Sequence, residues 1–365
     1  MLALLVCVPL AAHSKIPPKS KRGPRDLLIV AGGDVAYPRG WMDRLVERRG
    51  EKMFEQVRGF AKAADLAFVN LESPYTDRPF KLKKQFQVVT PPPRLDYVLS
   101  GGFNLFSLAN NHMFDAGPEG IDDTLALLAE KKKGNPNLWW AGAGKTSQEA
   151  LKPAVFTVPG KQLEVCFHSF GYAGSSLVAI PGTEESFAAV KRSAGKCDLV
   201  IVSVHHGIEY HHVPPKAKAE LYRRYIDAGA DVLLGHHPHV IQGIEVYKKG
   251  IIFHSLGNFS FASKTNRHHA TGAKLYSILP LIYIKDGKVE RAEVLPLYVN
   301  NSEPWTLDGK TLASIDFTPQ VLKGGFAQAV MSELRDWTAA IPGIAKSAVE
   351  AYQIKGDRIR LQVRR

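Results

Sequence analysis

Residue types that bind divalent metals recur along this 365-residue chain, and they are densest in the segment Gly235-His236-His237-Pro238-His239. Three imidazoles this close together would repel one another if protonated, which favours a shared cation. Seven of the 13 histidines fall in short groups at positions 205–206, 211–212 and 236–239. Histidines scattered over a surface would not group in this way. The sequence therefore predicts a metal site that includes this segment.

Carboxylate, imidazole and amide groups elsewhere in the chain complete the candidate ligand set. The residues that supply these three ligand types are Asp34, Glu72, Asn111, His112, His205, His237 and His239. A site that holds two metal ions a few ångströms apart needs about this many ligands, including a carboxylate that bridges them. Each residue is weak evidence alone. Together they predict one divalent ion or a close pair, drawn from Mn, Zn, Fe, Mg and Ca.

Short apolar segments precede these polar residues and are predicted to be buried strands. They alternate with amphipathic segments at 53–64, 120–132 and 216–228, which are predicted helices. The predicted strands cover residues 27–31, 66–69, 103–108, 199–204 and 232–234. Strand–helix alternation indicates an α/β fold with a mainly parallel sheet, and ligands bind at the carboxyl ends of such strands. Five separate strands are therefore expected to deliver polar side chains to one edge.

The pattern changes after residue 260. Apolar segments at 275–284 and 289–299 flank Lys285-Asp286-Gly287-Lys288, which predicts a β-hairpin. A helix is predicted at 324–340. We expect one domain over residues 27–301, and we interpret residues 302–365 as a C-terminal helical appendage on that domain.

The first 14 residues are apolar and uncharged and end in Ala12-His13-Ser14, which fits the hydrophobic region and cleavage site of a signal peptide. The usual preceding positive charge is missing, which would place the start codon upstream. Residues 15–26 are basic and are interpreted as a solvated linker. Export to the periplasmic or extracellular face of the envelope is expected. Cys166 and Cys197 are expected to be buried thiols, with a disulfide between them as the alternative in an oxidising compartment.

The formal net charge of +12 suits an anionic partner. Part of this charge lies in basic groups near both ends, at 15–25 and 358–365, which we interpret as solvated and flexible. Basic residues are not interleaved with aromatic residues, and no nucleic-acid reader motif is present, so no nucleic-acid partner is expected.

Motifs in order along the chain resemble those of a known family. They are Gly33-Asp34, Val69-Asn70-Leu71-Glu72, the Leu108–Asp115 segment, His205 with Gly207, Glu209 and Tyr210, Ile226–Asp231, Gly235–Val240 and Ser255–Phe259. Over roughly residues 27–300 the chain resembles the CapA family, named for poly-γ-glutamate capsule synthesis proteins and related to the calcineurin-like metallophosphoesterases. The resemblance implies a sandwich of two β-sheets flanked by helices. It also implies a role with capsular polymer and with membrane proteins of capsule synthesis.

The resemblance also assigns roles to individual residues. Asp34 matches the first metal aspartate and Glu72 the bridging carboxylate. Asn111 with His112 matches an Asn-His pair, His205 a lone histidine, and His237 with His239 the final His-x-His; His236 is an alternative to one of the last two. In a hydrolytic site a metal-activated water would attack phosphorus or a carbonyl carbon. His112 would then protonate the leaving group, oriented by Asp115. Glu209, Asn258 and Arg39 are candidates for substrate binding.

Three departures weaken an analogy with ordinary phosphodiester hydrolysis. Ala36 stands where phosphoesterases have a histidine two residues after the first aspartate, and Glu72 stands where they have aspartate. Asp115 follows His112 by three residues instead of one. Three functions therefore stay open. They are a metal-dependent hydrolase of a phosphoester or γ-glutamyl polymer, a non-catalytic accessory protein for polymer assembly or export, and metal-assisted acid–base chemistry on a peptide, such as epimerisation.

Overall fold

Two large β-sheets form the centre of the protein in the computed structural model, which describes residues 16–40, 43–81, 87–261, 275–299, 304–314 and 317–364. In the first sheet the strands are β1 (Leu27–Ala36), β2 (Leu66–Leu71), β3 (Leu105–Ser107), β4 (Trp139–Ala141), β11 (Asn258–Phe261), β12 (Tyr276–Lys285), β13 (Lys288–Tyr298), β16 (Gln320–Val321), β17 (Tyr352–Lys355) and β18 (Arg358–Gln362). In the second they are β5 (Ala154–Thr157), β6 (Glu164–Gly171), β7 (Leu199–His205), β8 (Val232–His236), β9 (Ile241–Tyr247) and β10 (Gly250–Leu256). A small hairpin contains β14 (Trp305–Leu307) and β15 (Lys310–Leu312).

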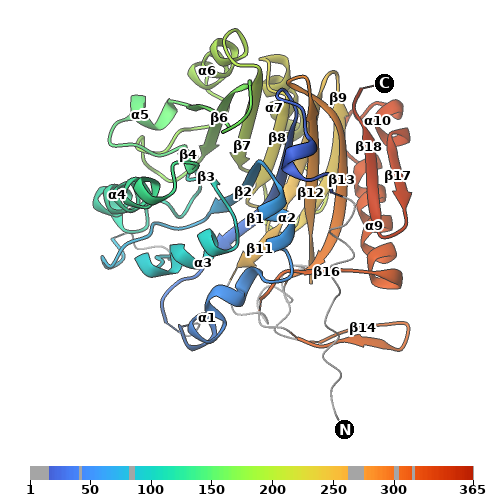
Figure 1. The fold of residues 1–365 in the computed structure, drawn as a ribbon, viewed down its shortest axis with the longest axis horizontal. Helices are drawn as coiled ribbons and strands as arrows, with labels where there is room; N and C mark the ends of the chain where they lie inside the picture. Colours follow the sequence, from blue (N-terminus) through green and yellow to red (C-terminus); the bar gives the residue numbers. More distant parts are fainter. Residues whose placement is uncertain are drawn as a thin grey trace.

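Helices flank the two sheets. They are α1 (Asp43–Arg49), α2 (Arg58–Ala63), α3 (Leu95–Ser100), α4 (Gly117–Gly134), α5 (Ser147–Leu151), α6 (Glu184–Ala194), α7 (Lys216–Asp227), α9 (Gly324–Ala339) and α10 (Lys346–Glu350), with short 3-10 turns at Lys19–Lys21, Gly50–Phe54 and Pro92–Arg94. Figure 1 shows α3 and α4 on the side of β3 and β4, and α9 and α10 beside β17 and β18. The predicted helix at 53–64 is interrupted, since a 3-10 turn ends at Phe54 and α2 begins at Arg58.

The strand order explains why both parallel and antiparallel patterns occur in the sequence. The first sheet runs β17-β18-β13-β12-β1-β2-β3-β4, with β11 also on β1 and β16 on β13; the second runs β5-β6-β7-β8-β10-β9. Strands β1 to β4 are parallel to one another, as are β6, β7, β8 and β10. The outer strands, including the predicted hairpin β12–β13, are antiparallel. The expected α/β sandwich of two sheets flanked by helices is confirmed.

Strand β1 is buried on both faces. Leu27 and Ile29 pack between the two sheets, whereas Leu28 and Val30 pack under the helices that cover the first sheet. A third core, between the second sheet and helices α6 and α7, includes Tyr222. A strand with two buried faces reads as a continuous apolar run, and for this reason the segment 27–31 was recognisable in the sequence.

The side chain of one residue of the basic segment before β1, Arg22, is buried, although Lys19 and Lys21 are exposed as expected. The predicted signal peptide at 1–14 falls outside the described residues, but residues 16–26 are described. The buried Arg22 guanidinium lies 3.1 Å from the Asp65 carboxylate and donates to the Ala63 carbonyl oxygen, and Arg25 pairs with Asp198. Asp65 is itself buried at the start of β2, and a buried carboxylate requires a counter-charge or hydrogen bonds. Arg22 meets that requirement.

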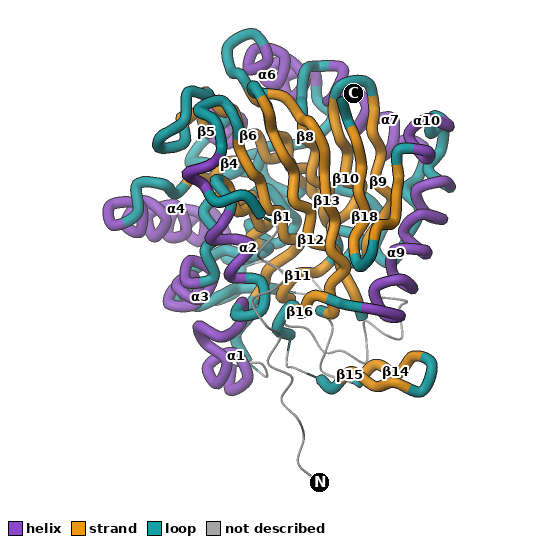
Figure 2. Tube along the Cα trace, turned by 45° about the vertical axis from the view of Figure 1, so that its right-hand side comes forward, coloured by secondary structure: helices purple, strands orange, loops and turns teal. Residues whose placement is uncertain are grey.

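The C-terminal segment contains strands as well as the expected helix. Strand β18 pairs with β13, and β17 pairs with β18, so residues 352–362 extend the first sheet. Helix α9 packs against β9 and β13 (Figure 2), and Phe326, Val330 and Leu334 on it join the core between the sheets. This segment is therefore more than a helical appendage.

Cys166 and Cys197 form a disulfide, so the expectation of two buried thiols is wrong and the alternative is confirmed. Cys166 lies on β6, and Cys197 lies just before β7, the parallel strand paired with β6. The pairing of these strands brings the two Cα atoms to 5.8 Å, a separation that a disulfide can span.

Candidate metal centre

The two sheets deliver polar side chains to the same place. Asp34 lies near the end of β1 and Glu72 follows β2; from the second sheet, His205 ends β7 and His236 ends β8. His236 donates from Nδ1 to Asp34 Oδ1 at 2.8 Å, which joins the two sheets directly. The strand ends expected from the sequence therefore do converge. The site is built across the sandwich, whereas the sequence pattern suggested the edge of one sheet.

Asp34, Glu72 and His239 form a triad that could hold a metal ion. One candidate ligand atom from each residue lies within 4.8 Å of the others, and all three residues are buried. His239 Nε2 is 3.8 Å from Glu72 Oε1, and His239 Nδ1 is 3.9 Å from Asp34 Oδ2. The triad thus combines two carboxylates with one imidazole, a donor set typical of divalent cations.

A second group of donor atoms gathers around His205 Nε2. This atom is 2.8 Å from Asn111 Oδ1, 3.1 Å from His237 Nδ1 and 3.5 Å from Glu72 Oε1. The same Glu72 oxygen therefore faces His239 on one side and His205 on the other. Amide oxygen, imidazole nitrogen and carboxylate oxygen converge here as they would around a cation.

His236 and His237 make different contacts in the structure. The His237 ring faces His205, with which it would share a cation. His236 is completely buried, bonds to Asp34 through Nδ1 and lies against the Phe68 ring at a centroid distance of 5.5 Å. His236 thus holds the Asp34 carboxylate in place.

Three asparagines position the cluster, and sequence reasoning did not assign them this role. Asn70 Nδ2 donates to Asp34 Oδ1 at 2.9 Å and lies 3.2 Å from His205 Nδ1. Asn110 Nδ2 donates to the Leu71 carbonyl oxygen, and Asn258 Oδ1 accepts from His239 Nδ1 at 2.8 Å. Asn258 had been a candidate for substrate binding, whereas its observed contact orients a candidate metal ligand. The one signal available for these residues was that each sits in a polar cluster at a predicted strand end.

The backbone is strained where the histidines are presented. His237 and His239, on either side of Pro238, have φ angles of 93° and 57°, which residues other than glycine rarely adopt. Such conformations persist where the surrounding structure enforces them, commonly at functional sites. At the other side of the cluster, a Cβ on Gly33 would stand 1.8 Å from the Gly257 carbonyl oxygen. Glycine is therefore required next to Asp34.

Burial keeps two histidines of the cluster, His205 and His237, neutral. Desolvation, reinforced by the neighbouring His237 and His236, holds the pKa of His205 well below its usual value, and burial with the nearby His239 lowers the pKa of His237 to about 3. Burial alone would raise the pKa of Asp34, but the adjacent His236 and the hydrogen bonds it receives more than offset this, and the net shift is downward. Neutral imidazole and ionised carboxylate are the forms that bind metals.

His112 and Asp115 form a pair beside the cluster. His112 Nδ1 is 2.7 Å from Asp115 Oδ2, which also accepts a hydrogen bond from the Val88 amide. The Asp115 amide bonds to the His112 carbonyl oxygen, so a tight turn brings the two side chains together. Because Nδ1 is engaged with Asp115, proton exchange with a substrate has to occur at Nε2 of His112.

Of the other two candidate substrate-binding residues, Arg39 has its contacts away from the cluster. Arg39 donates to the Thr76 carbonyl oxygen at 2.6 Å and to Asp77 Oδ1 at 2.7 Å, so it holds the loop after β2. The Glu209 side chain is exposed on the loop after β7. Ala36, which replaces the histidine of phosphoesterases, is fully buried and contributes no ligand.

The residues present fit a divalent cation. Among the described residues, Asp34 Oδ2 is buried and accepts no hydrogen bond, although such an oxygen normally requires a partner. It faces His239, which belongs to the same triad. A cation beside Asp34 Oδ2 would compensate this buried charge.

These features define an α/β sandwich protein with a buried cluster of candidate metal ligands where the ends of its two sheets meet. The chain belongs to the bacterial capsule synthesis protein PGA_cap family, whose sequence profile matches residues 28–263. It is 30% identical over 299 residues to the PGA biosynthesis protein CapA of Bacillus subtilis, which covers 79% of this chain and 76% of that protein. It is 28% identical over 305 residues to the capsule biosynthesis protein CapA of Bacillus anthracis, with 79% and 71% covered.

More distant similarities are also found. A probable polyglutamine synthesis accessory protein of Mycobacterium tuberculosis is 27% identical over 222 residues, which covers 54% of this chain and 55% of that protein. Among solved structures, a phosphatase from Mycoplasma pneumoniae aligns with a TM-score of 0.47 at 15% identity, covering 74% of this chain and 93% of that one. No helix of the described residues combines the length and the apolar character needed to cross a bilayer.

Proposed function

We propose that this protein is a metal-dependent hydrolase that processes an anionic capsular polymer of the poly-γ-glutamate type. The observation that carries the proposal is the position of Glu72 between two groups of donor atoms. Its Oε1 atom lies 3.8 Å from His239 Nε2 and 3.5 Å from His205 Nε2. A carboxylate in this position suits a pair of close cations, one held by Asp34, Glu72 and His239 and the other by Glu72, His205, Asn111 and His237.

The chain's own residues would divide the work of hydrolysis. When bound, a divalent cation supplies positive charge that polarises a phosphoryl or carbonyl oxygen and makes water more acidic. His236 and Asn70 hold Asp34 by hydrogen bonds, so the ligand carboxylate keeps its orientation. His112 transfers a proton through Nε2 to the leaving group, and Asp115 fixes its tautomer and orientation.

The disulfide supports a location outside the reducing cytoplasm. Structural disulfides persist in oxidising compartments, and Cys166 pairs with Cys197. Together with the apolar first 14 residues, this favours export to the periplasmic or extracellular face of the envelope, where capsular polymer is found. Partners there would be the polymer and membrane proteins of its synthesis.

The test combines metal content with turnover. Purified protein loaded with Mn²⁺ or Zn²⁺ should release nitrophenol from a model phosphoester or shorten poly-γ-glutamate. Asp34→Ala should lose metal and activity, whereas His112→Ala should keep metal and lose activity. Glu55→Gln, which removes an exposed carboxylate just before α2, is the matched control and should behave as the wild type. Wild-type protein that holds less than about half an ion per chain would end the proposal.

A second candidate function is a metal-bound accessory protein without turnover. It is favoured by Ala36, which leaves one metal position without the histidine that phosphoesterases place there, and by the name of the mycobacterial relative, a probable polyglutamine synthesis accessory protein. This alternative predicts full metal content with no product from either substrate. It also predicts normal polymer production in cells that carry His112→Ala.

A further inference from the structure

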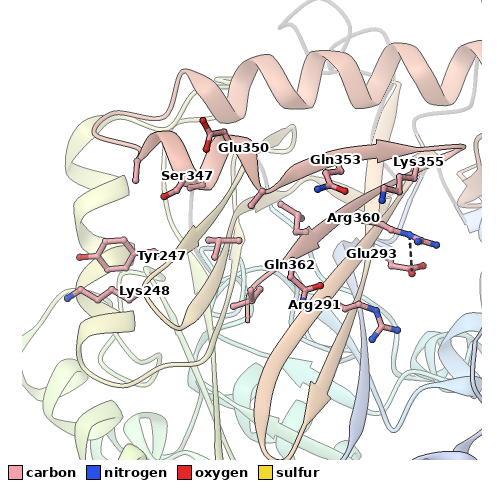
Figure 3. Close-up of a pocket in the computed structure, with 16 residues that line it drawn as sticks. Tyr247, Lys248, Arg291, Glu293, Ser347, Glu350, Gln353, Lys355, Arg360 and Gln362 are labelled. Atoms are coloured by element: carbon pink, nitrogen blue, oxygen red, sulfur yellow. Dashed lines mark ion pairs between the residues drawn. The ribbon is translucent and has the colours of Figure 1, made fainter. Parts of the chain in front are cut away.

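A cavity of about 1040 Å³ lies in the C-terminal part of the protein, away from the metal centre (Figure 3). Its walls come from β13, β17 and β18 of the first sheet, from α10, and from the end of β9 with the following turn at Lys248. It is therefore formed by the segment after residue 345 where this segment packs on the sandwich.

The sheet wall of the cavity is polar because three neighbouring strands present alternate residues to it. The side chains that line it from these strands are Arg291, Glu293, Gln353, Lys355, Arg360 and Gln362. Arg291 is opposite Gln362, and Arg360 lies between Glu293 and Gln353 in the strand register. Successive residues of a strand point to opposite faces, and Ala292 and Ile359 accordingly lie in the core.

Positive charge is in excess on this wall. Glu293 is buried and lies between two guanidinium groups, that of Arg358 and that of Arg360 at 3.5 Å. One carboxylate therefore faces two cations. Lys355 is exposed and forms no ion pair with any described residue. On the other side of the cavity, Lys248 pairs with Asp227, and Glu350 of α10 adds one carboxylate to the lining. An anion in the cavity would meet cations that the protein leaves partly uncompensated.

The strand register places this wall at the opposite end of the first sheet from the metal centre. Leu28, Tyr283, Arg291 and Gln362 form one row across the strands β1, β12, β13 and β18. Asp34 lies six residues further along β1, which is about 20 Å at about 3.3 Å per residue. Three strand spacings, about 14 Å in total, separate the row's two ends. One ligand group cannot occupy both places.

We propose that this cavity binds an extended acidic polypeptide through its carboxylates. A guanidinium group offers paired donors that match the two oxygens of a carboxylate, and Arg360 supplies such a group. The ammonium group of Lys355 supplies a second positive charge for carboxylates of the bound chain. The Gln353 amide can both donate to and accept from the peptide groups of such a chain, which a polyphosphate lacks. The Gln362 amide nitrogen donates to the carbonyl oxygens of Glu290 and Arg364, so this side chain offers its oxygen as an acceptor. The cavity is a binding site separate from the metal centre, and it does not depend on hydrolysis there.

The experiment measures binding of fluorescently labelled poly-glutamate to the full-length protein by anisotropy. Lys355→Gln with Arg360→Gln removes two cations from the wall and leaves Arg358 on the buried Glu293. The control is Lys133→Gln with Lys145→Gln, which removes two exposed cations elsewhere. We expect the first pair to weaken binding about tenfold and the control to leave it within about twofold.

Each outcome decides the proposal. Unchanged affinity in the first double variant overturns it, as does an equal loss in both double variants, because that result indicates unspecific attraction to a basic protein. A polyphosphate of equal charge that binds more tightly, with the same dependence on Arg360, overturns the choice of a carboxylate ligand. Asp34→Asn should abolish turnover and retain poly-glutamate binding, so failure at the metal centre is distinguishable from failure at the cavity. Circular dichroism of each variant confirms that it is folded.

Discussion

Replacement of Glu72 by glutamine should stabilise the metal-free protein and remove its stabilisation by metal. Glu72 and Asp34 are both fully buried, with candidate ligand oxygens within 4.8 Å of each other. Two negative charges about 5 Å apart repel by about 3 kcal/mol at an effective dielectric constant of about 20. His205 cannot offset this repulsion, because burial holds its pKa well below the usual value and the ring is neutral.

The expected gain is somewhat smaller than the full repulsion. Glutamine has nearly the volume of glutamate, so the change opens no cavity, but it weakens the attraction between the carboxylate and the nearby rings of His205 and His239. We therefore expect the free energy of unfolding in EDTA to rise by about 2 kcal/mol. In the wild type, free Mn²⁺ at about 100 times its dissociation constant should add about 2.7 kcal/mol, whereas Glu72→Gln should gain less than about 1 kcal/mol.

Urea unfolding of both proteins, with EDTA and with Mn²⁺, measures these changes. Glu55→Gln is the control, since it removes an exposed carboxylate and should alter neither value. A metal-free Glu72→Gln protein that is less stable than the wild type would show that the carboxylates do not repel as reasoned. Full stabilisation of this variant by Mn²⁺ would show that Glu72 is not a ligand.

Three further predictions concern other parts of the molecule. Asp115→Asn should lower turnover about a hundredfold at unchanged metal content, because His112 loses the charge that supports its protonated form; a parallel loss of metal would contradict this. Burial lowers the pKa of His168 to about 4, so the unfolded chain alone binds a proton there below about pH 6.5. Stability should accordingly fall by about 3 kcal/mol between pH 6.5 and 4 in urea unfolding, and His168→Gln should remove this part of the pH dependence. Cys166→Ser with Cys197→Ser opens a loop with a sequence separation of 31 and should cost about 3 to 4 kcal/mol, whereas dithiothreitol should not destabilise the variant further.

The local sequence was enough to recognise the strands that are buried on both faces and the polar residues that follow these strands. The segment 27–31 is continuously apolar because β1 packs against the second sheet on one face and against helices on the other. Asp34 follows this apolar segment and belongs to the candidate site. The hairpin around Asp286 and Gly287 was also predictable, since both residues adopt positive φ angles that asparagine, aspartate and glycine tolerate best. These features depend on neighbours in sequence, so one chain is enough to recognise them.

Long-range packing decided what the sequence left open. His237 faces His205 and His236 bonds to Asp34, and the sequence spacing of adjacent histidines carries no information on these contacts. Arg22 was expected in solvent because its partner, Asp65, is 43 positions away and becomes buried only in the fold.

The candidate metal site shows the same division. The sequence by itself determined which residue types stand at the strand ends. Polar side chains are unfavourable within a strand that is buried on both faces, so they occur where the strand ends. Only the tertiary structure decided that the ends of two sheets meet, with Glu72 between His205 and His239. The physical reason is that strand order and sandwich packing are set by the sum of many apolar contacts, none of which has a local signature.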